Sequence, residues 1–342
     1  MKKLLLAVLT FATLSVQAQE APKVTSAIIA LRGNEIVEAK GFIDEATTII
    51  KGKNPAEIKE KIMTKYYYNR ALIYAQIAGS PDAAIKVLAD DANSVAAESI
   101  LDLLKYESTL KKPRYSEDAI REIPNIAYNY LVEAAAAYEA GNYVASYNGY
   151  MAAFDFKKNE WLGEFAQLDT GLLFNAGIIA GMSGDQESSI NAFRTCLNLG
   201  YTGITYTATY AASGQPKQYP NKAAMEKEIE LGLASDPLIG EDVRPSVYIS
   251  LINAYKKMEN AEMYESTLTE ARGLYPENKD LLDIQLQSFL DKKDYDGALA
   301  NLDEAIAKNP GKGIYHFVKG NILQTELKDL DAELALLGDD ND

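Results

Sequence analysis

A repeat of 34 residues is the feature that most limits what this chain can fold into. Residues 247–278 and 281–312 align without a gap at that spacing, so Pro276 corresponds to Pro310 and Ala271 to Ala305. Agreement at so many positions indicates one structural unit that is used more than once. Four further pairs keep the spacing: Leu268 and Leu302, Tyr255 and Phe289, Asn260 and Asp294, and Ile252 and Leu286.

Each repeated unit has the pattern of two antiparallel helices. Ala271, Ala298 and Ala305 are small enough for two helices to cross closely, while bulkier residues such as Leu302 fill the gap to the next pair. Pro310 cannot continue a helix and therefore enforces a turn. These positions are those of the tetratricopeptide repeat (TPR), and residues 245–323 resemble that family.

Weaker copies of the unit lie upstream. Gly177 and Ala134 take the crossing position in two of them, and Gly79 and Ala39 fit two still weaker copies. The resemblance implies an all-α fold, an α-solenoid of about seven TPR-like helical hairpins. The expected superhelical domain spans 19–337, with weak repeats at 23–92, an inserted helix within 92–122, repeats at 123–200, an insertion at 201–244, strong repeats at 245–323 and a cap to 337.

The second insertion contains a segment with the period of a β-strand. Residues 204–210 read ITYTATY, which places Tyr206 and Tyr210 on one face and threonines on the other. A turn at 213–214 predicts a small β-hairpin near 203–219. Because a two-stranded ribbon is only marginally stable alone, we expect neighbouring helices to cover its tyrosine face. It either covers a flank of the repeats or brings its tyrosines to a partner.

The first eighteen residues have the pattern of a secretory signal peptide. Lys2 and Lys3 precede an apolar stretch at 4–16, and 16–18 reads as a cleavage site of small residues. We therefore expect export, most simply to the periplasm. The only cysteine, Cys196, lies far from that cleavage site, so no lipid anchor is expected. No later stretch has the length of a membrane-spanning helix, so no integral membrane segment is expected.

The charge balance excludes some partners. The chain has 34 basic and 49 acidic residues and a net charge of −15, which becomes −17 without Lys2 and Lys3. Such a field repels nucleic acids and anionic lipid surfaces. It favours a basic partner, and residues 338–342 read as a solvated acidic tail.

The sequence holds no recognisable catalytic or metal-binding pattern. His316, the only histidine, takes a bulky packing position of the last repeat, and Cys196 takes a small buried one. Nucleophile, zinc-protease, phosphate-loop and dinucleotide motifs are missing from the sequence. We therefore expect a protein that is not an enzyme and uses neither cofactor nor metal.

A superhelix of helical hairpins has a concave face lined by the first helix of each pair. In the family that the chain resembles, this groove binds extended peptides or a partner's helix. Some members of that family bind a ligand's C-terminal carboxylate with a set of Lys, Asn and Arg residues, and this set is incomplete here. Each candidate residue could equally lie on a solvated helix face without binding a partner. The groove candidates are Tyr66, Asn69, Arg70, Tyr128, Leu131, Asn175, Ile178, Ile249, Asn253 and Lys256.

These observations predict an exported, non-catalytic scaffold that binds a protein or peptide, with an envelope complex as the expected setting. The alternative is a carbohydrate-binding protein of the envelope whose tyrosines stack on sugar rings, since the chain has 22 tyrosines.

Overall fold

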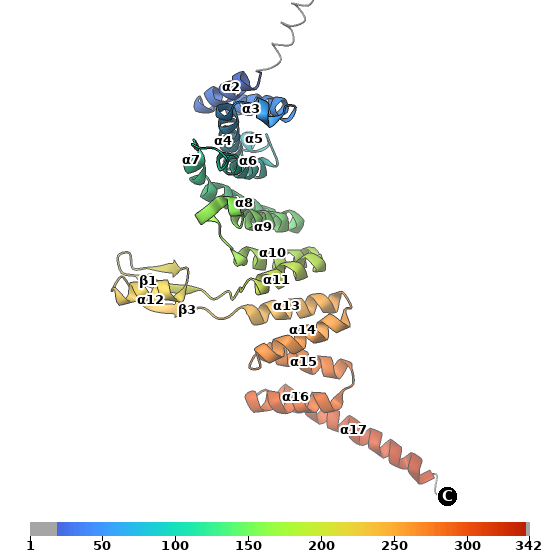
Figure 1. Cartoon of the computed structure of the whole chain (residues 1–342). Coiled ribbons are helices and arrows are strands. Elements are labelled where there is room, and N and C mark those ends of the chain that lie inside the picture. Colours follow the sequence, from blue (N-terminus) through green and yellow to red (C-terminus); the bar gives the residue numbers. More distant parts are fainter. Residues whose placement is uncertain (1–18, 340–342) are drawn as a thin grey trace, which may run out of the picture. The chain divides into compact units, whose positions relative to one another are not determined.

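The computed structural model describes residues 19–339 and divides them into two compact units. The first unit ends at Ser183 and the second begins at Gly184; Figure 1 labels their elements. The predicted signal peptide at 1–18 and residues 340–342 of the acidic tail lie outside the described residues.

Helical hairpins build the first unit. Within residues 19–183 they are α2 (Glu20–Arg32) with α3 (Ile36–Lys51), α4 (Glu60–Ala78) with α6 (Ala92–Glu107), and α8 (Ile123–Glu139) with α9 (Tyr143–Lys157), followed by α10 (Thr170–Ser183). Short helical turns lie between them: η1 (Pro55–Glu57), α5 (Ala83–Lys86), α7 (Ser116–Ile120) and η2 (Glu160–Phe165). In each pair the two helices pack on one another, and α10 packs on α9.

The second hairpin of this unit differs from the sequence-based expectation. A weak repeat ending at residue 92 requires its second helix between Gly79 and that residue, but only the four-residue helix α5 forms there, and Val87 is exposed. Instead α6 packs along α4. Ile100 and Leu103 of α6 are fully buried, and this burial is what fixes the longer helix in place. The stretch that we expected to be an inserted helix is therefore the second helix of this hairpin.

Helical hairpins also make up most of the second unit, where the 34-residue period is strongest. Their helices are α11 (Gln186–Asn198), α13 (Arg244–Lys257), α14 (Ala261–Leu274), α15 (Lys279–Asp291), α16 (Tyr295–Lys308) and α17 (Gly313–Asp339). The pairs α13–α14 and α15–α16 are antiparallel neighbours, and α17 packs on α16. This confirms the all-α fold of TPR-like helical hairpins.

The matched pair Asn260 and Asp294 has a specific structural role. Each is the N-cap of the second helix of its hairpin, and its side-chain oxygen accepts a hydrogen bond from the backbone N–H three residues on, at 3.1 and 2.9 Å. The residue before each N-cap has a positive φ, 54° before Asn260 and 56° before Asp294. The repeat therefore preserves one turn geometry, a left-handed residue followed by a polar cap.

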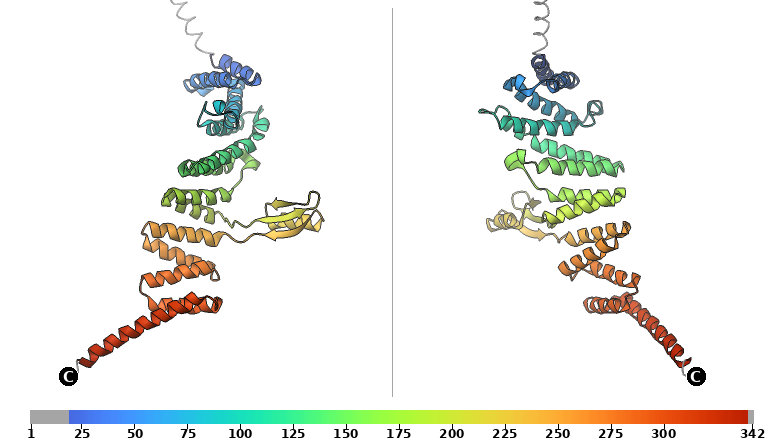
Figure 2. Two further views of the ribbon diagram at one scale, coloured as in Figure 1. Left: turned by 180° about the vertical axis from the view of Figure 1, so that it is seen from behind. Right: turned by 45° about the vertical axis from the view of Figure 1, so that its right-hand side comes forward.

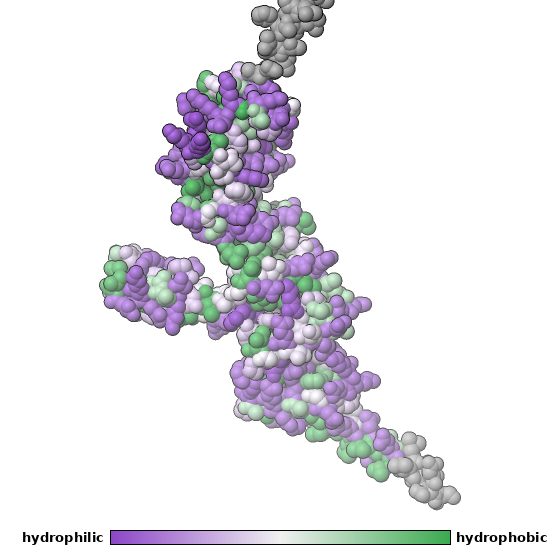
Figure 3. Space-filling view, viewed as in Figure 1, coloured by the Kyte–Doolittle hydropathy of each residue, from purple (hydrophilic) through white to green (hydrophobic). Residues whose placement is uncertain are grey.

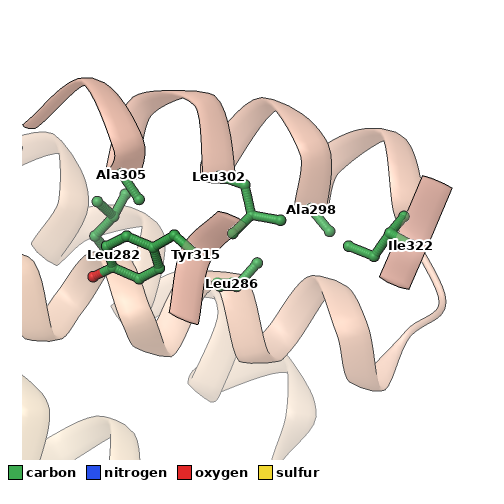
Figure 4. Close-up of a cluster of buried hydrophobic side chains, with 7 residues drawn as sticks. All are labelled: Leu282, Leu286, Ala298, Leu302, Ala305, Tyr315 and Ile322. Carbon is green, nitrogen blue, oxygen red and sulfur yellow. The ribbon is translucent and has the colours of Figure 1, made fainter. Parts of the chain in front are cut away.

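Small and large side chains alternate in the core between α15, α16 and α17. Figure 4 shows Leu302 of α16 lying over Leu286 of α15, with Ala298 and Ala305 on the same face of α16. Ala298 and Leu302 are fully buried. The alanines let the helices approach closely, as the sequence pattern predicted. The cluster consists of Leu282, Leu286, Ala298, Leu302, Ala305, Tyr315 and Ile322.

The insertion in the second unit is a small α/β module. The predicted hairpin is confirmed as β1 (Tyr206–Tyr210) and β2 (Gln215–Tyr219), which pair antiparallel with Tyr206 opposite Tyr219. A third strand that the sequence did not reveal, β3 (Ala234–Ile239), pairs with the other edge of β1. The strand order is β2-β1-β3, and α12 (Lys222–Glu230) contacts all three strands.

The module has a hydrophobic core of its own. Ala208 and Tyr219 from the hairpin pack with Met225 of α12 and Ala234 of β3. Both views in Figure 2 show α12 lying against the sheet. This corrects the expectation that the neighbouring repeat helices cover the hairpin. A helix and a third strand supply the apolar contact that a two-stranded ribbon lacks.

None of the helices in residues 19–339 has both the length and the hydropathy needed to cross a bilayer.

Candidate partner-binding groove

An open groove lies on the first unit, where the first helices of its three hairpins come together. Its volume is about 700 Å³. Leu72 and Ala75 of α4 and Leu31 of α2 give it apolar contact, and Tyr128 of α8 is 65% exposed beside them. The remaining lining residues are Arg32, Gln76, Gly79, Ser80, Pro81, Glu122, Asn125 and Asn129.

Helical periodicity places these side chains together. On α4, Leu72, Ala75, Gln76 and the C-capping Gly79 recur every three or four residues and so share one face of the helix. On α8 the same spacing aligns positions 125, 128 and 129. The groove is thus lined mainly by regular helix faces, with Gly79, Ser80 and Pro81 added by the loop after α4. Side chains held on helices keep most of its shape fixed before a ligand arrives.

Three carboxamides give the groove hydrogen-bonding capacity. Gln76 donates from Nε2 to Asn34 Oδ1 at 3.0 Å, and Asn125 donates from Nδ2 to Glu122 Oε2 at 3.3 Å. Asn129 lies next to Gly79, and both polar atoms of its amide are 3.5 Å from where a Cβ on Gly79 would stand. A carboxamide has two N–H donors and one acceptor oxygen, so it can bond to both the N–H and the C=O of an extended peptide.

Three of the predicted groove residues are buried between helices instead. Tyr66 donates from its hydroxyl to Thr47 Oγ1 at 3.0 Å, and Asn69 donates to the backbone oxygen of Lys65 at 2.8 Å. Arg70 donates to Ser99 Oγ at 2.8 Å. All three side chains are buried, so an open groove does not reach them. The prediction used the wrong face of α4. The helix turns the face with residues 72, 75 and 76 toward the groove, rather than the face with residues 66, 69 and 70.

The other predicted residues of the first unit lie at the surface. Tyr128 lines the groove, and Leu131 is half-buried on the same helix, α8. Asn175 and Ile178 are exposed on α10. The structure therefore places one of the ten predicted residues, Tyr128, in this groove.

Predicted residues of the second unit lie elsewhere. Ile249 is half-buried, whereas Asn253 and Lys256 are exposed on α13. Lys256 lines a smaller pocket of about 200 Å³ between α13, α14 and α15, and its Nζ lies 3.6 Å from Asp291 Oδ2.

The two tyrosines of the insertion stay within the β-module. Tyr206 packs against the module's own core, and Lys217 Nζ lies 4.8 Å from the ring centroid of Tyr210.

The residues missed by the sequence reasoning are Leu72, Gln76, Asn125 and Asn129. The spacing of 72, 75, 76 and 79 was a readable signal, because residues three or four apart share one face of a helix. It was missed because the repeat register used for α4 was extrapolated from more regular copies further along the chain.

Cys196 and His316, the only cysteine and the only histidine of the sequence, lie in different environments. The Cys196 thiol is fully buried, and this burial raises its pKa to about 11, which disfavours the nucleophilic thiolate. His316 is exposed rather than packed, with Nε2 3.3 Å from the backbone oxygen of Pro310. Among the described residues, no three His, Cys, Asp or Glu side chains are grouped as a metal ion would require.

Most tyrosines in contact with aromatic neighbours have a packing role. Tyr68 stacks on Tyr115 with ring centroids 4.8 Å apart. Tyr248 donates to Glu270 Oε1 at 2.6 Å in the second unit. Tyr128 differs from these because it is largely exposed and lines a groove.

No family model matches the sequence, and no curated protein matches it. Among solved structures, the chain is similar to the Cut9–Hcn1 hetero-tetramer of the APC/C, with 14% identity, 89% of this chain and 43% of that chain covered, and a TM-score of 0.32. It is also similar to PilF of Pseudomonas aeruginosa, with 12% identity and a TM-score of 0.31. That match covers 88% of this chain and 97% of the PilF chain.

A tetratricopeptide repeat protein from Parabacteroides merdae is similar as well, with 10% identity and a TM-score of 0.28. That match covers 89% of this chain and 98% of the other chain. This chain spans less than half of the Cut9–Hcn1 chain that it matches. Because the TM-scores are low, we take the TPR-like fold from the hairpins themselves and draw no function from these structures.

Proposed function

From a TPR-like fold of stacked helical hairpins, we propose that this protein is a non-catalytic scaffold that binds a protein or peptide in the groove between α2, α4 and α8. One observation supports this most directly. The first helices of three consecutive hairpins contribute apolar, amide and tyrosine side chains to one open groove, whose volume is about 700 Å³.

An extended peptide suits this surface better than a compact small molecule. The carboxamides of Gln76, Asn125 and Asn129 come from two different helices, so they can bond to peptide groups at successive positions. Leu72 and the ring of Tyr128 offer contact to the ligand's side chains. The combination resembles other peptide-binding grooves, in which backbone bonds supply affinity and side-chain contacts supply specificity.

We further propose that the protein acts after export, in the periplasm, with a partner in an envelope complex. The signal-peptide pattern of residues 1–18 supports export. The net charge of −17 after its removal favours a basic partner. Cell fractionation with an antibody against the chain tests the location, and recovery in the cytoplasm would contradict it.

Site-specific photo-crosslinking tests the groove. A photoreactive phenylalanine analogue at Tyr128 is expected to crosslink one protein reproducibly in intact cells. The matched control is the same analogue at Tyr138, which is also exposed on α8 but does not line the groove. Crosslinks of equal yield to the same protein from both positions, or none from Tyr128, would contradict binding in the groove.

A double variant tests the amides. In Gln76→Ala/Asn129→Ala we expect the crosslink from position 128 to fall about tenfold, since two hydrogen bonds contribute about 0.5–1.5 kcal/mol each. The melting temperature is expected to change little, because both side chains lie at the surface of the groove. An unchanged crosslink would remove these amides from the site.

Carbohydrate binding is the second candidate, and the exposed ring of Tyr128 beside Asn125 and Asn129 is the observation that favours it. A sugar ring stacked on the tyrosine could bond to both amides. If this candidate is right, envelope oligosaccharides raise the melting temperature of the wild type but not of Tyr128→Ala. No shift in either protein would rule it out.

A further inference from the structure

The helix α17 exposes a stripe of leucines, which we call the leucine stripe: Leu323, Leu327, Leu330 and Leu334. Each is between 48% and 65% exposed. Their spacing of four, three and four residues is that of the a and d positions of a heptad, so they share one face of the helix. Figure 3 shows hydrophobic surface along this part of α17. Exposed leucines at this spacing mark an interaction surface.

A comparison inside the second unit indicates what fits the stripe. On α15, Leu286 and Phe289 pack against α16, the next helix of the chain. The positions 34 residues further on are Gly320 and Leu323 of α17. There the chain continues as one straight helix to Asp339, so this face receives no following helix within the described residues. A different face of α17 packs on the repeat, because Ile322 is buried against α16.

We infer that the leucine stripe of α17 binds an amphipathic helix of another protein, one with an apolar face bordered by Lys and Arg. The stripe has acidic borders. Glu326 and Glu333 immediately precede two of its leucines on one side, and Asp331 follows one on the other side. In heptad terms these are g and e positions, which pair with charges on the opposing helix. A basic amphipathic helix is therefore complementary in both shape and charge.

Charge also argues against a second copy of this chain as the occupant. In a parallel pair, Glu326 of one copy would face Asp331 of the other. In an antiparallel pair, the glutamate side of the stripe would face the same glutamates. Both arrangements place like charges side by side, which disfavours self-pairing. The occupant is thus a different, basic helix, and the surface is separate from the groove of the first unit.

The test uses the full chain and two synthetic helices of about three heptads each. Both carry leucine at the a and d positions and a fluorescent label. One has lysine at every e and g position, and the other has glutamate there. Fluorescence anisotropy at low salt is expected to show binding of the basic helix, with affinity falling as salt is added, and binding at least ~10-fold weaker for the acidic helix.

The decisive variant is Leu327→Glu/Leu330→Glu, which interrupts the stripe with residues that also favour helix. We expect it to weaken binding of the basic helix at least ~10-fold, since each buried leucine contributes strongly to such contacts. The matched control is Asn321→Glu/Thr325→Glu, which adds the same charge at two exposed positions on another face of α17. This control is expected to bind as tightly as the wild type, and circular dichroism checks that both variants keep their helices.

Three results would overturn the inference. They are equal binding of the acidic and basic helices, equal loss of binding in both variants, and a dimer in light scattering that only the stripe variant makes monomeric. The last result would assign the stripe to a second copy. The groove variant Gln76→Ala/Asn129→Ala is expected to bind the basic helix normally, so a failure of the groove proposal is distinguishable from a failure of this one.

Discussion

The hairpin α15–α16 and the hairpin α4–α6 solve the same packing problem with different side chains. Between α15 and α16, Leu286, Leu302 and Ala298 form an apolar core. Between α4 and α6, the buried guanidinium of Arg70 donates to Ser99 Oγ at 2.8 Å and lies 3.3 Å from a carboxylate oxygen of Glu98. The first hairpin is stabilised mainly by removing apolar area from water, whereas the second also buries a charged side chain that is hydrogen-bonded to Ser99.

This difference explains where sequence reasoning succeeded. An apolar core of alanine and leucine leaves a periodic pattern that can be aligned from copy to copy. A buried arginine looks like a surface residue in the sequence, because charged side chains are almost always exposed. Asn69 and Arg70 were therefore assigned to an open groove, although the structure places both inside the protein.

The largest expected effect is in the apolar hairpin. Leu302→Ala removes a fully buried side chain, and we expect it to lower the free energy of unfolding by about 2–5 kcal/mol. Because repeats are stabilised by their neighbours, amide hydrogen exchange is expected to quicken most in α15, α16 and α17. Leu274→Ala on α14 is the control, since this leucine is exposed and its loss is expected to cost less than about 0.5 kcal/mol. If Leu302→Ala lowers the free energy of unfolding by less than about 1 kcal/mol, the apolar core does not stabilise α15–α16 as the comparison with α4–α6 states.

A smaller effect is expected from the polar hairpin. Ser99→Ala removes the oxygen that accepts a hydrogen bond from the charged guanidinium of Arg70. We expect the free energy of unfolding, measured in urea, to fall by about 1.5–3 kcal/mol. Thr48→Ala in the same unit is the matched control, because Thr48 Oγ1 bonds to a carbonyl four residues back as Ser99 does but is exposed. Equal stability of the two variants would show that the Arg70–Ser99 bond contributes nothing.

The third prediction concerns how closely helices approach. In Gly149→Ala, the new Cβ would lie 2.9 Å from the Cβ of Ala134 on α8, so we expect a loss of about 1–3 kcal/mol.

Gly273→Ala on α14 is the counterpart and the smallest effect. No atom lies within 4 Å of its new Cβ, so we expect a gain of about 0.5–1 kcal/mol. Thermal unfolding gives the melting temperatures of both glycine variants. If the two melting temperatures shift in the same direction relative to the wild type, the packing described for α8 and α9 is contradicted.

The candidate site was less accessible from the sequence than the fold. Tyr128 was predicted by carrying the register of the repeat across to this helix. Gln76 and Asn129 were not, because the groove depends on which faces of α4 and α8 turn toward each other. In the structure α4 packs on α6, whereas the sequence pattern after Gly79 suggested a different partner for α4.

The sequence by itself determined that the chain forms helical hairpins, where the second unit turns at Asn260 and Asp294, and that a β-hairpin interrupts the helices. These features depend on residues close together in the chain, whose periodicity and capping can be read directly. Only the tertiary structure decided that α6 pairs with α4, that α12 and β3 complete the β-module, and which helix faces remain open. Those outcomes depend on apolar area buried between segments distant in sequence, and that burial leaves no local pattern.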